Sequence, residues 1–479
     1  MNANLWRALM RRKSVEAIQA QSDEESGPRL HRILDARDVF NHGVAAIIGT
    51  GIFVLTGVAA ANIAGPGILI SFVLAGLACA MVSFAYAEQA SMIPVSGSAY
   101  TYAYATLGEL VAWLIGWDLL LEYAVGASAV ASGWSAYFQS ILHGLGLQLP
   151  AALAAAPSTW SITQVWPTSI DLPAVLIVTF INFWLIKGVK HTAKMTSVFV
   201  IIKLLVVLFF IAVGAFHIDP ANYSPFLPFG WSGVMAGAGT VFFAFIGFDA
   251  VTTLSEECKD PQKDVPKGVI WSLVVCTILY VLVAVVMTGA ISYSNLGGAG
   301  EGAPMAKVFD HIGLTWATPL VSVGAIAGIT SVLVVLLYGQ SRIMMRMSKD
   351  GLVAPLFGQI SQRFHTPVWS IICWGVLVAL SAGLIPIGEL AELTSIGTLF
   401  AFVIVSIGVI VLRRVEPNRP RGFRCPGYPY VPALGAIFSL VLMLSLPAIT
   451  WLRFAIWMLI GLLVFFVYSK RHSRLNIGP

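Results

Sequence analysis

Long apolar segments, separated by short polar ones, run along almost the whole chain. Twelve of them approach or exceed the length that a helix needs to cross about 30 Å of hydrocarbon. The predicted spans are residues 40–64, 66–93, 108–140, 171–187, 192–216, 230–255, 266–291, 314–340, 367–386, 390–412, 430–450 and 452–469. The fourth has little length to spare. This pattern predicts an all-α integral membrane protein with twelve transmembrane helices.

The composition agrees with that pattern. Hydrophobic residues make up 58% of the 479 residues and charged residues 11%, whereas a soluble domain carries about 25% charged residues. Of the 28 lysines and arginines, 25 fall in the N-terminal arm, in the loops after even-numbered spans and in the C-terminal tail. Because such residues stay on the cytoplasmic side, we expect a multi-pass protein of the cell membrane with both termini cytoplasmic. The net charge of +5 then follows from topology, and no nucleic-acid partner is expected.

Two of the predicted spans, the first and the sixth, are interrupted in the middle. The first contains Gly49-Thr50-Gly51, and the sixth is interrupted between Phe243 and Gly247. Each interruption frees backbone N–H and C=O groups in the bilayer, where only protein or a bound polar solute can satisfy them. Interruptions at corresponding places in two halves of a chain are typical of a transporter's midplane binding site.

The same pattern divides the chain into five parts. They are a cytoplasmic arm (1–39), two five-helix repeats (40–216 and 230–412), a pair of C-terminal spans (430–469) and a cytoplasmic tail (470–479). Because five is odd, the second repeat starts on the opposite side of the membrane and is inverted relative to the first.

The interruptions supply opposite partial charges. The first begins a new helix near Gly51, whose free N–H groups suit a carboxylate. The second ends a half-helix near Phe243, whose free carbonyls suit an ammonium group. Together they predict a binding site for the charged groups of an α-amino acid. The alternative is that these glycines serve helix packing, as small residues in membrane spans often do. The candidate substrate-binding residues are Ile47, Ile48, Gly49, Thr50, Gly51, Phe243, Ala244, Phe245, Ile246 and Glu122.

The apolar flanks of this receptor favour a small or medium neutral side chain. Glu122, deep in the third span, leaves a cationic side chain as the alternative. Phe243 and Phe245 are candidate aromatic lids over the ligand. Glu88 and Arg342, at the cytoplasmic ends of spans, are candidates for ion pairs that close an inner gate; solvated span ends are the other interpretation.

Two buried ionisable groups are candidates for proton coupling. Lys203 is the only charge between residues 195 and 216, and removing an ammonium from water favours the neutral amine. It is therefore either a proton carrier or a permanently charged tether. Its expected partners are backbone carbonyls of the first span near Gly43–Ile47, with Thr330 and Ser331 nearby. Glu122, one helical turn from Asp118, is a second candidate proton site or a polar residue on the substrate side. Asp118 is expected to pair with a neighbouring hydroxyl or Trp N–H, and a satisfied polar network is the alternative for both.

Several motifs resemble those of the amino acid–polyamine–organocation transporters, particularly bacterial relatives of the cationic amino acid transporters. They are Ile48-Gly49-Thr50-Gly51-Ile52-Phe53, Tyr86-Ala87-Glu88 with Pro94-Val95-Ser96-Gly97-Ser98-Ala99-Tyr100, Gly116-Trp117-Asp118-Leu119-Leu120-Leu121-Glu122-Tyr123, Phe243-Ala244-Phe245-Ile246-Gly247-Phe248-Asp249, and Ser348-Lys349-Asp350-Gly351-Leu352. The resemblance covers about residues 35–470. It implies the five-helix inverted repeat (LeuT-type fold) and the same substrate site at Ile47–Gly51 and Phe243–Ile246. In proton-coupled members, a lysine at the position of Lys203 takes the place of a bound ion.

We therefore expect a proton-coupled symporter that carries small neutral L-amino acids, such as alanine, into the cell by alternating access. The alternatives are an exchanger or facilitator without proton coupling, which could take cationic amino acids, and a receptor that binds without transporting. The expected partners are the amino acid, protons and membrane lipid. Neither a cofactor nor a metal is expected, and the chain shows no enzymatic constellation.

Overall fold

The computed structural model describes residues 11–16, 18, 34–93, 95, 98–157, 169–187, 192–297, 303–364 and 366–476. Three parts of the prediction lie outside these ranges. They are most of the N-terminal arm (1–39), three residues of the motif after the second span (Pro94, Ser96 and Gly97), and part of the connection between the third and fourth predicted spans (158–168). The described residues form helices joined by short connections and contain no β-strand. A single isolated bridge pairs Leu34 with Cys258.

The main helices follow the predicted spans closely. They are α3 (Ala36–Ile47), α5 (Ile68–Met92), α7 (Glu109–Gly144), α9 (Leu172–Lys187), α10 (Thr192–Gly214), α11 (Gly230–Val241), α12 (Pro261–Ala290), α14 (Ala317–Lys349), α15 (Val368–Leu384), α16 (Ile387–Val415), α17 (Tyr430–Leu444) and α18 (Ala448–Val464). Short helices between them include α6 (Ser98–Thr106), α8 (Ala151–Ala154), α13 (Pro304–His311) and α19 (Lys470–His472).

Within the described residues, eight helical segments are long and apolar enough to cross a membrane, fewer than the twelve expected. Two causes account for the difference. The helical structure is continuous from Gly51 to Met92, so the second half of the first predicted span and the second span count as one segment. Three further apolar helices, α9, α15 and α17, contain fewer than 18 residues. The all-helical, multi-pass architecture is as expected.

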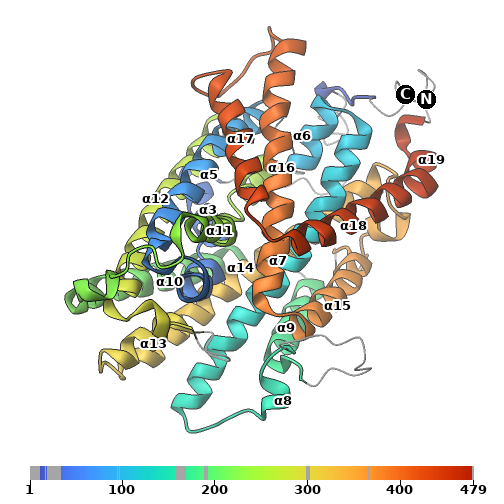
Figure 1. Ribbon diagram of the computed structural model, residues 1–479. Helices are drawn as coiled ribbons and strands as arrows, with labels where there is room; N and C mark the ends of the chain where they lie inside the picture. Colours follow the sequence, from blue (N-terminus) through green and yellow to red (C-terminus); the bar gives the residue numbers. More distant parts are fainter. Residues whose placement is uncertain are drawn as a thin grey trace.

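The helix α7 occupies the centre of the molecule. It is 36 residues long and packs along α14 on one side and α16 on another, while α5 packs along α12 and α10 along α14. The short helices α8 and α13 lie at one end of the bundle, and α6 and α19 lie at the opposite end (Figure 1). The interrupted segments are therefore held inside a packed bundle.

At the α6 end, the carboxylate of Asp350 joins four segments of the chain. It accepts a hydrogen bond from the Lys13 ammonium at 3.0 Å and from the Tyr100 hydroxyl at 2.8 Å, and Arg346 lies 3.8 Å away. The backbone carbonyl of Asp350 accepts from the N–H of Arg474. Burial and the neighbouring carboxylate raise the pKa of Tyr100 well above its usual value, so its phenol stays protonated and donates. Asp350 thus ties both ends of the chain to the bundle.

We predict that Asp350→Ala destabilises the protein by about 3 kcal/mol, because it removes the acceptor of the buried Tyr100 hydroxyl and the carboxylate that pairs with the mostly buried Lys13 and Arg346. The measurement is thermal unfolding in detergent. Asp260→Ala is the matched control, since Asp260 pairs with Lys263 at the surface and exposed pairs contribute at most about 1 kcal/mol. Equal melting temperatures for the two variants would contradict this role of Asp350.

Candidate functional site

Both predicted interruptions are present in the structure. The helix α3 ends at Ile47, Ile48 adopts an extended conformation (ψ 98°), and a π-helix, η1 (Gly51–Leu55), follows. In the second half of the chain, α11 passes into a short 3-10 helix, η6 (Phe242–Phe245), and Ile246 is extended (ψ 139°). Another 3-10 helix, η7 (Ala250–Glu257), then follows. Each segment therefore exposes helix ends within the bundle, where backbone groups have no helical partner.

The two interruptions touch each other at glycines. A Cβ on Gly51 would lie 2.3 Å from the Cα of Ala244, closer than any side chain permits. Gly247 has a positive φ of 108°, and a Cβ there would lie 3.0 Å from Ala46. Glycine is therefore required at both positions, for close approach at Gly51 and for backbone conformation as well at Gly247.

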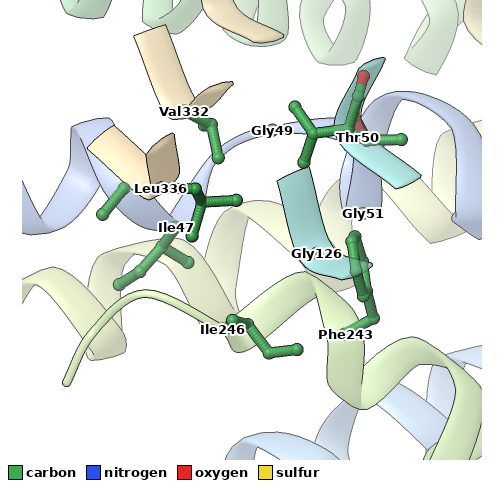
Figure 2. A pocket seen from close by; sticks show the side chains of 11 residues that line it. Ile47, Gly49, Thr50, Gly51, Gly126, Phe243, Ile246, Val332 and Leu336 are labelled. Atoms are coloured by element: carbon green, nitrogen blue, oxygen red, sulfur yellow. The ribbon is translucent and has the colours of Figure 1, made fainter. Parts of the chain in front are cut away.

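A small cavity lies where the interruptions meet. Its walls come from both interruptions, from α7 and from α14, and its volume is about 20 Å³, which is room for about one water molecule. In Figure 2, Ile47, Val332 and Leu336 lie on one side of this hollow, and Thr50 and Phe243 lie on the other. The lining residues are Ala46, Ile47, Gly49, Thr50, Gly51, Gly126, Val130, Phe243, Ile246, Val332 and Leu336.

Six of the ten predicted substrate-binding residues line this cavity: Ile47, Gly49, Thr50, Gly51, Phe243 and Ile246. The other four, Ile48, Ala244, Phe245 and Glu122, lie just outside the lining. The carbonyl group of Ile48 accepts a hydrogen bond from the Lys203 ammonium, and that of Ala244 accepts one from the Tyr280 hydroxyl. Glu122 lies one turn of α7 away from Gly126. The hydroxyl of Thr50 donates to the carbonyl of Val130 at 3.3 Å, so it already has a protein partner.

Phe245 does not form the expected lid. Its ring contacts Phe72 at a centroid distance of 6.3 Å and Tyr280 at 5.2 Å, so it faces α5 and α12 instead of the cavity. The reason is the tight turn of η6, which directs Phe243 and Phe245 to different sides. Of the two predicted lids, only Phe243 borders the cavity.

The sequence did not reveal the walls that α7 and α14 contribute. Gly126, Val130, Val332 and Leu336 are apolar residues within apolar spans, and nothing in such a span separates a cavity wall from a lipid-facing or packing residue. The small size of Gly126 is the only sign, and small residues are common wherever membrane helices pack.

Tyr280 of α12 was also missed, although it connects the two interruptions. Its hydroxyl oxygen lies 2.7 Å from the carbonyl of Ile47 and 2.7 Å from that of Ala244. A hydroxyl has one hydrogen to donate, so it can satisfy either carbonyl at a given moment. The other carbonyl then lacks this donor.

Lys203 of α10 reaches the first interruption directly. Its ammonium donates to the carbonyl of Ala45 at 2.6 Å, to that of Ile48 at 2.9 Å and to the hydroxyl oxygen of Ser331 at 3.2 Å. The side chain is fully buried. The expected partners from α3 and Ser331 are therefore present, whereas Thr330 accepts from the indole N–H of Trp134.

The chain is similar to known transporters along almost its entire length. The model of the amino acid permease family matches residues 37–476. The chain is 49% identical to the branched-chain amino acid permease BcaP of Bacillus subtilis, over 98% of this chain and 99% of that protein. It is 47% identical to the methylthioribose transporter of the same organism, with the same coverage, and 30% identical to the vacuolar cationic amino acid transporter 4 of Arabidopsis thaliana, over 98% of this chain and 96% of that protein.

This chain belongs to the amino acid permease family. It is a membrane transporter and not an enzyme, and its family is part of the superfamily that the sequence motifs indicated.

In this permease, the candidate gate residue Glu88 lies buried at the end of α5. Its carboxylate accepts hydrogen bonds from Arg413 at 2.6 and 2.8 Å, from Arg421 at 3.1 Å and from the backbone N–H of Cys425 at 2.7 Å. Burial, followed by the charge of Glu88, raises the pKa of the Cys425 thiol to about 12, so this thiol stays protonated. Glu88 therefore joins α5 to the segment that follows α16.

Arg342, the other candidate gate residue, lies elsewhere. It is on α14, where it contacts the hydroxyl and the ring of Tyr338 on the same helix. Glu88 and Arg342 thus belong to separate sets of contacts, and the ion pair of Glu88 with Arg413 connects α5 to α16.

We predict that Gly51→Ala weakens amino acid binding by roughly tenfold or more, because separating the two interruptions costs about 1–3 kcal/mol. Counterflow of labelled alanine in proteoliposomes measures the effect. Gly388→Ala, at the start of α16, is the control, since a Cβ there meets nothing within 4 Å. Unchanged counterflow in the Gly51 variant would show that contact between the interruptions is not needed for binding.

Proposed function

We propose that this permease is a proton-coupled symporter that brings small neutral L-amino acids, such as alanine, into the cell by alternating access. The observation that carries the proposal is the meeting of two unwound helix segments at one cavity, with Lys203 bonded to one of them. Amino acid transport is the activity named in its family and in several relatives.

The backbone of the two interruptions provides the receptor for the zwitterion. N–H groups at the start of η1 carry partial positive charge and would take the carboxylate. Carbonyls at the end of η6 carry partial negative charge and would take the ammonium. Because Gly49 and Gly51 lack a Cβ, a ligand can approach this backbone closely.

The walls of the cavity favour a neutral side chain. None of the lining residues is charged, and Val130, Ile246, Val332 and Leu336 are branched aliphatic residues. A cationic side chain would need an acidic partner in this apolar surrounding. Glu122, one turn of α7 below Gly126, is the observation that favours cationic amino acids as the second candidate substrate class.

Lys203 gives the proposal its coupling mechanism. An ammonium has three N–H donors, and the three acceptors around Lys203 match them. A neutral amine has only two, so loss of the proton removes one of the bonds that hold the end of α3 to α10 and α14. Protonation of Lys203 and the position of the first interruption are thereby linked, as a symport cycle requires.

We also propose the finer topology: twelve spans, with an inverted repeat formed by residues 40–216 and 230–412, and both termini in the cytoplasm. Movement of α3, α5, α11 and α12 against α7, α9, α14 and α15 would then open each side in turn. The ion pairs of Glu88 would hold the inner side closed, and Arg342 is the second candidate at that side.

Uptake by the purified protein in proteoliposomes tests the function. We expect an inward proton gradient to drive accumulation of labelled alanine, and excess unlabelled neutral aliphatic amino acids to compete more strongly than arginine. Stronger competition by arginine would assign the cationic class instead. Uptake that ignores the gradient would favour an exchanger or facilitator, and binding without flux would favour a receptor.

We predict that Lys203→Ala abolishes proton-driven accumulation while counterflow of alanine persists. With one proton per substrate, a gradient of one pH unit supports up to about tenfold accumulation, and the variant should show none. Lys187→Ala is the control, because Lys187 lies exposed at the end of α9 against the ring of Phe183. Accumulation by the Lys203 variant at the wild-type level would assign the proton to another group.

A further inference from the structure

Two buried carboxyl groups on α7 lack any hydrogen-bond partner in the described part of the chain. Asp118 is 0% exposed and Glu122 is 2% exposed, and neither oxygen of either side chain forms a hydrogen bond there. A buried ionised carboxylate without a partner would cost several kcal/mol, so the resting form of both groups is the neutral acid and the ionised form is a short-lived, higher-energy state.

Glu122 and Asp118 lie one after the other along α7, between the cavity and the α6 end of the molecule. Along α7, Gly126 borders the cavity, Glu122 lies about 6 Å further on and Asp118 about 6 Å beyond that, at the helical rise of 1.5 Å per residue. Residues four apart share one face of a helix. The three positions therefore form one line.

The helix α16 runs alongside this line and offers small and hydroxyl-bearing residues to it. A Cβ on Gly126 would lie 3.2 Å from the side chain of Thr394, and Thr398 faces the carboxyl of Glu122. A Cβ on Gly397 would lie 2.7 Å from Oδ1 of Asp118. The absence of a side chain at Gly397 therefore leaves space for the Asp118 carboxyl between α7 and α16.

No cation neutralises Asp118 among the described residues. The ionisable groups of the helices packed on α7 have contacts elsewhere or lie near helix ends: Tyr338, Arg342, Arg346 and Lys349 on α14; Glu389, Glu392, Arg413 and Arg414 on α16; Tyr100, Tyr102 and Tyr104 on α6; Cys373 on α15; Lys187 on α9; Arg453 on α18. Glu122 lies within electrostatic range of Asp118, Asp249, Tyr86 and Tyr123, and all of these are acids.

We propose that Asp118 is a second protonation site, which receives the coupling proton from Glu122 and passes it towards the α6 end. Because the two carboxyls do not hydrogen-bond to each other, a water molecule between them takes the proton of Glu122 as it gives one of its own protons to the carboxylate of Asp118. The ionised Glu122 then takes a proton from a hydronium ion that enters through the cavity. Asp118 first loses its own proton to water when that end opens. The inference rests on the proposed proton coupling and adds a path for the proton.

The test uses the full chain in proteoliposomes with two variants that remove the acid in different ways. Asp118→Asn keeps the shape of the side chain, and Asp118→Ala removes its polar atoms. We expect either variant, if folded, to retain alanine counterflow within about twofold and to lose accumulation driven by a proton gradient. The conservative Asp118→Glu variant should recover part of that accumulation. Wild-type accumulation in a folded Asn or Ala variant would overturn the proposal.

Infrared spectroscopy gives a readout that does not depend on transport. Wild-type protein labelled with ¹³C-aspartate should show the C=O stretch of a buried aspartic acid at neutral pH, and a folded Asp118→Asn or Asp118→Ala variant should lose that intensity. Absence of an aspartic acid band in the wild type would overturn the proposal even if neither variant folds. If the wild-type protein fails to accumulate alanine but shows the band, proton coupling fails while the protonated state of Asp118 stands.

Discussion

The structure depends on backbone groups that two interrupted helices leave unpaired inside the bundle. In hydrocarbon each such group costs several kcal/mol unless a partner satisfies it. The chain meets this cost by bringing the interruptions together, with Gly51 against Ala244 and Gly247 against Ala46. Tyr280 then serves carbonyls of both segments. In the proposed function, a ligand with a carboxylate and an ammonium group would satisfy remaining donors and acceptors, so one constraint would account for both the close packing and the proposed binding site.

Lys203 extends this constraint to the surrounding helices. Its three hydrogen bonds link α10 to the end of α3 and to α14, so the first interruption cannot move relative to α14 without changing the surroundings of the ammonium. If Lys203 bonded only to groups that stay in place when the interruption moves, its charge state would not depend on the position of the helix. Its acceptors include carbonyl groups at the interruption itself, so the charge state of Lys203 and the position of the interruption depend on each other.

The sequence was most informative where it departs from an ordinary membrane span. Gly49-Thr50-Gly51, the break after Phe243 and the charge of Lys203 are all exceptions in apolar segments, and each lies where it was expected relative to its neighbours. Val332 and Leu336 could not be assigned to the cavity because they obey the span pattern. The partners of Glu88 were equally hidden, since Arg413 and Arg421 lie more than 300 residues away along the chain. Helix length alone identifies fewer spans than the twelve predicted, because α9, α15 and α17 are short and Gly51–Met92 is one continuous helical segment.

The parts of the chain that surround the cavity differ in how far they can move. A cavity of about 20 Å³ is smaller than any amino acid, so binding requires one of its walls to move. The interruptions have little freedom, since glycine contacts and Tyr280 hold them against each other. The walls from α7 and α14 consist of aliphatic side chains, which can change rotamer or shift with their helices. On the proposed function, the two interruptions, which are held against each other, would recognise the amino acid backbone, whereas selectivity for the side chain would depend on residues of α7 and α14 that a sequence pattern does not distinguish from ordinary packing.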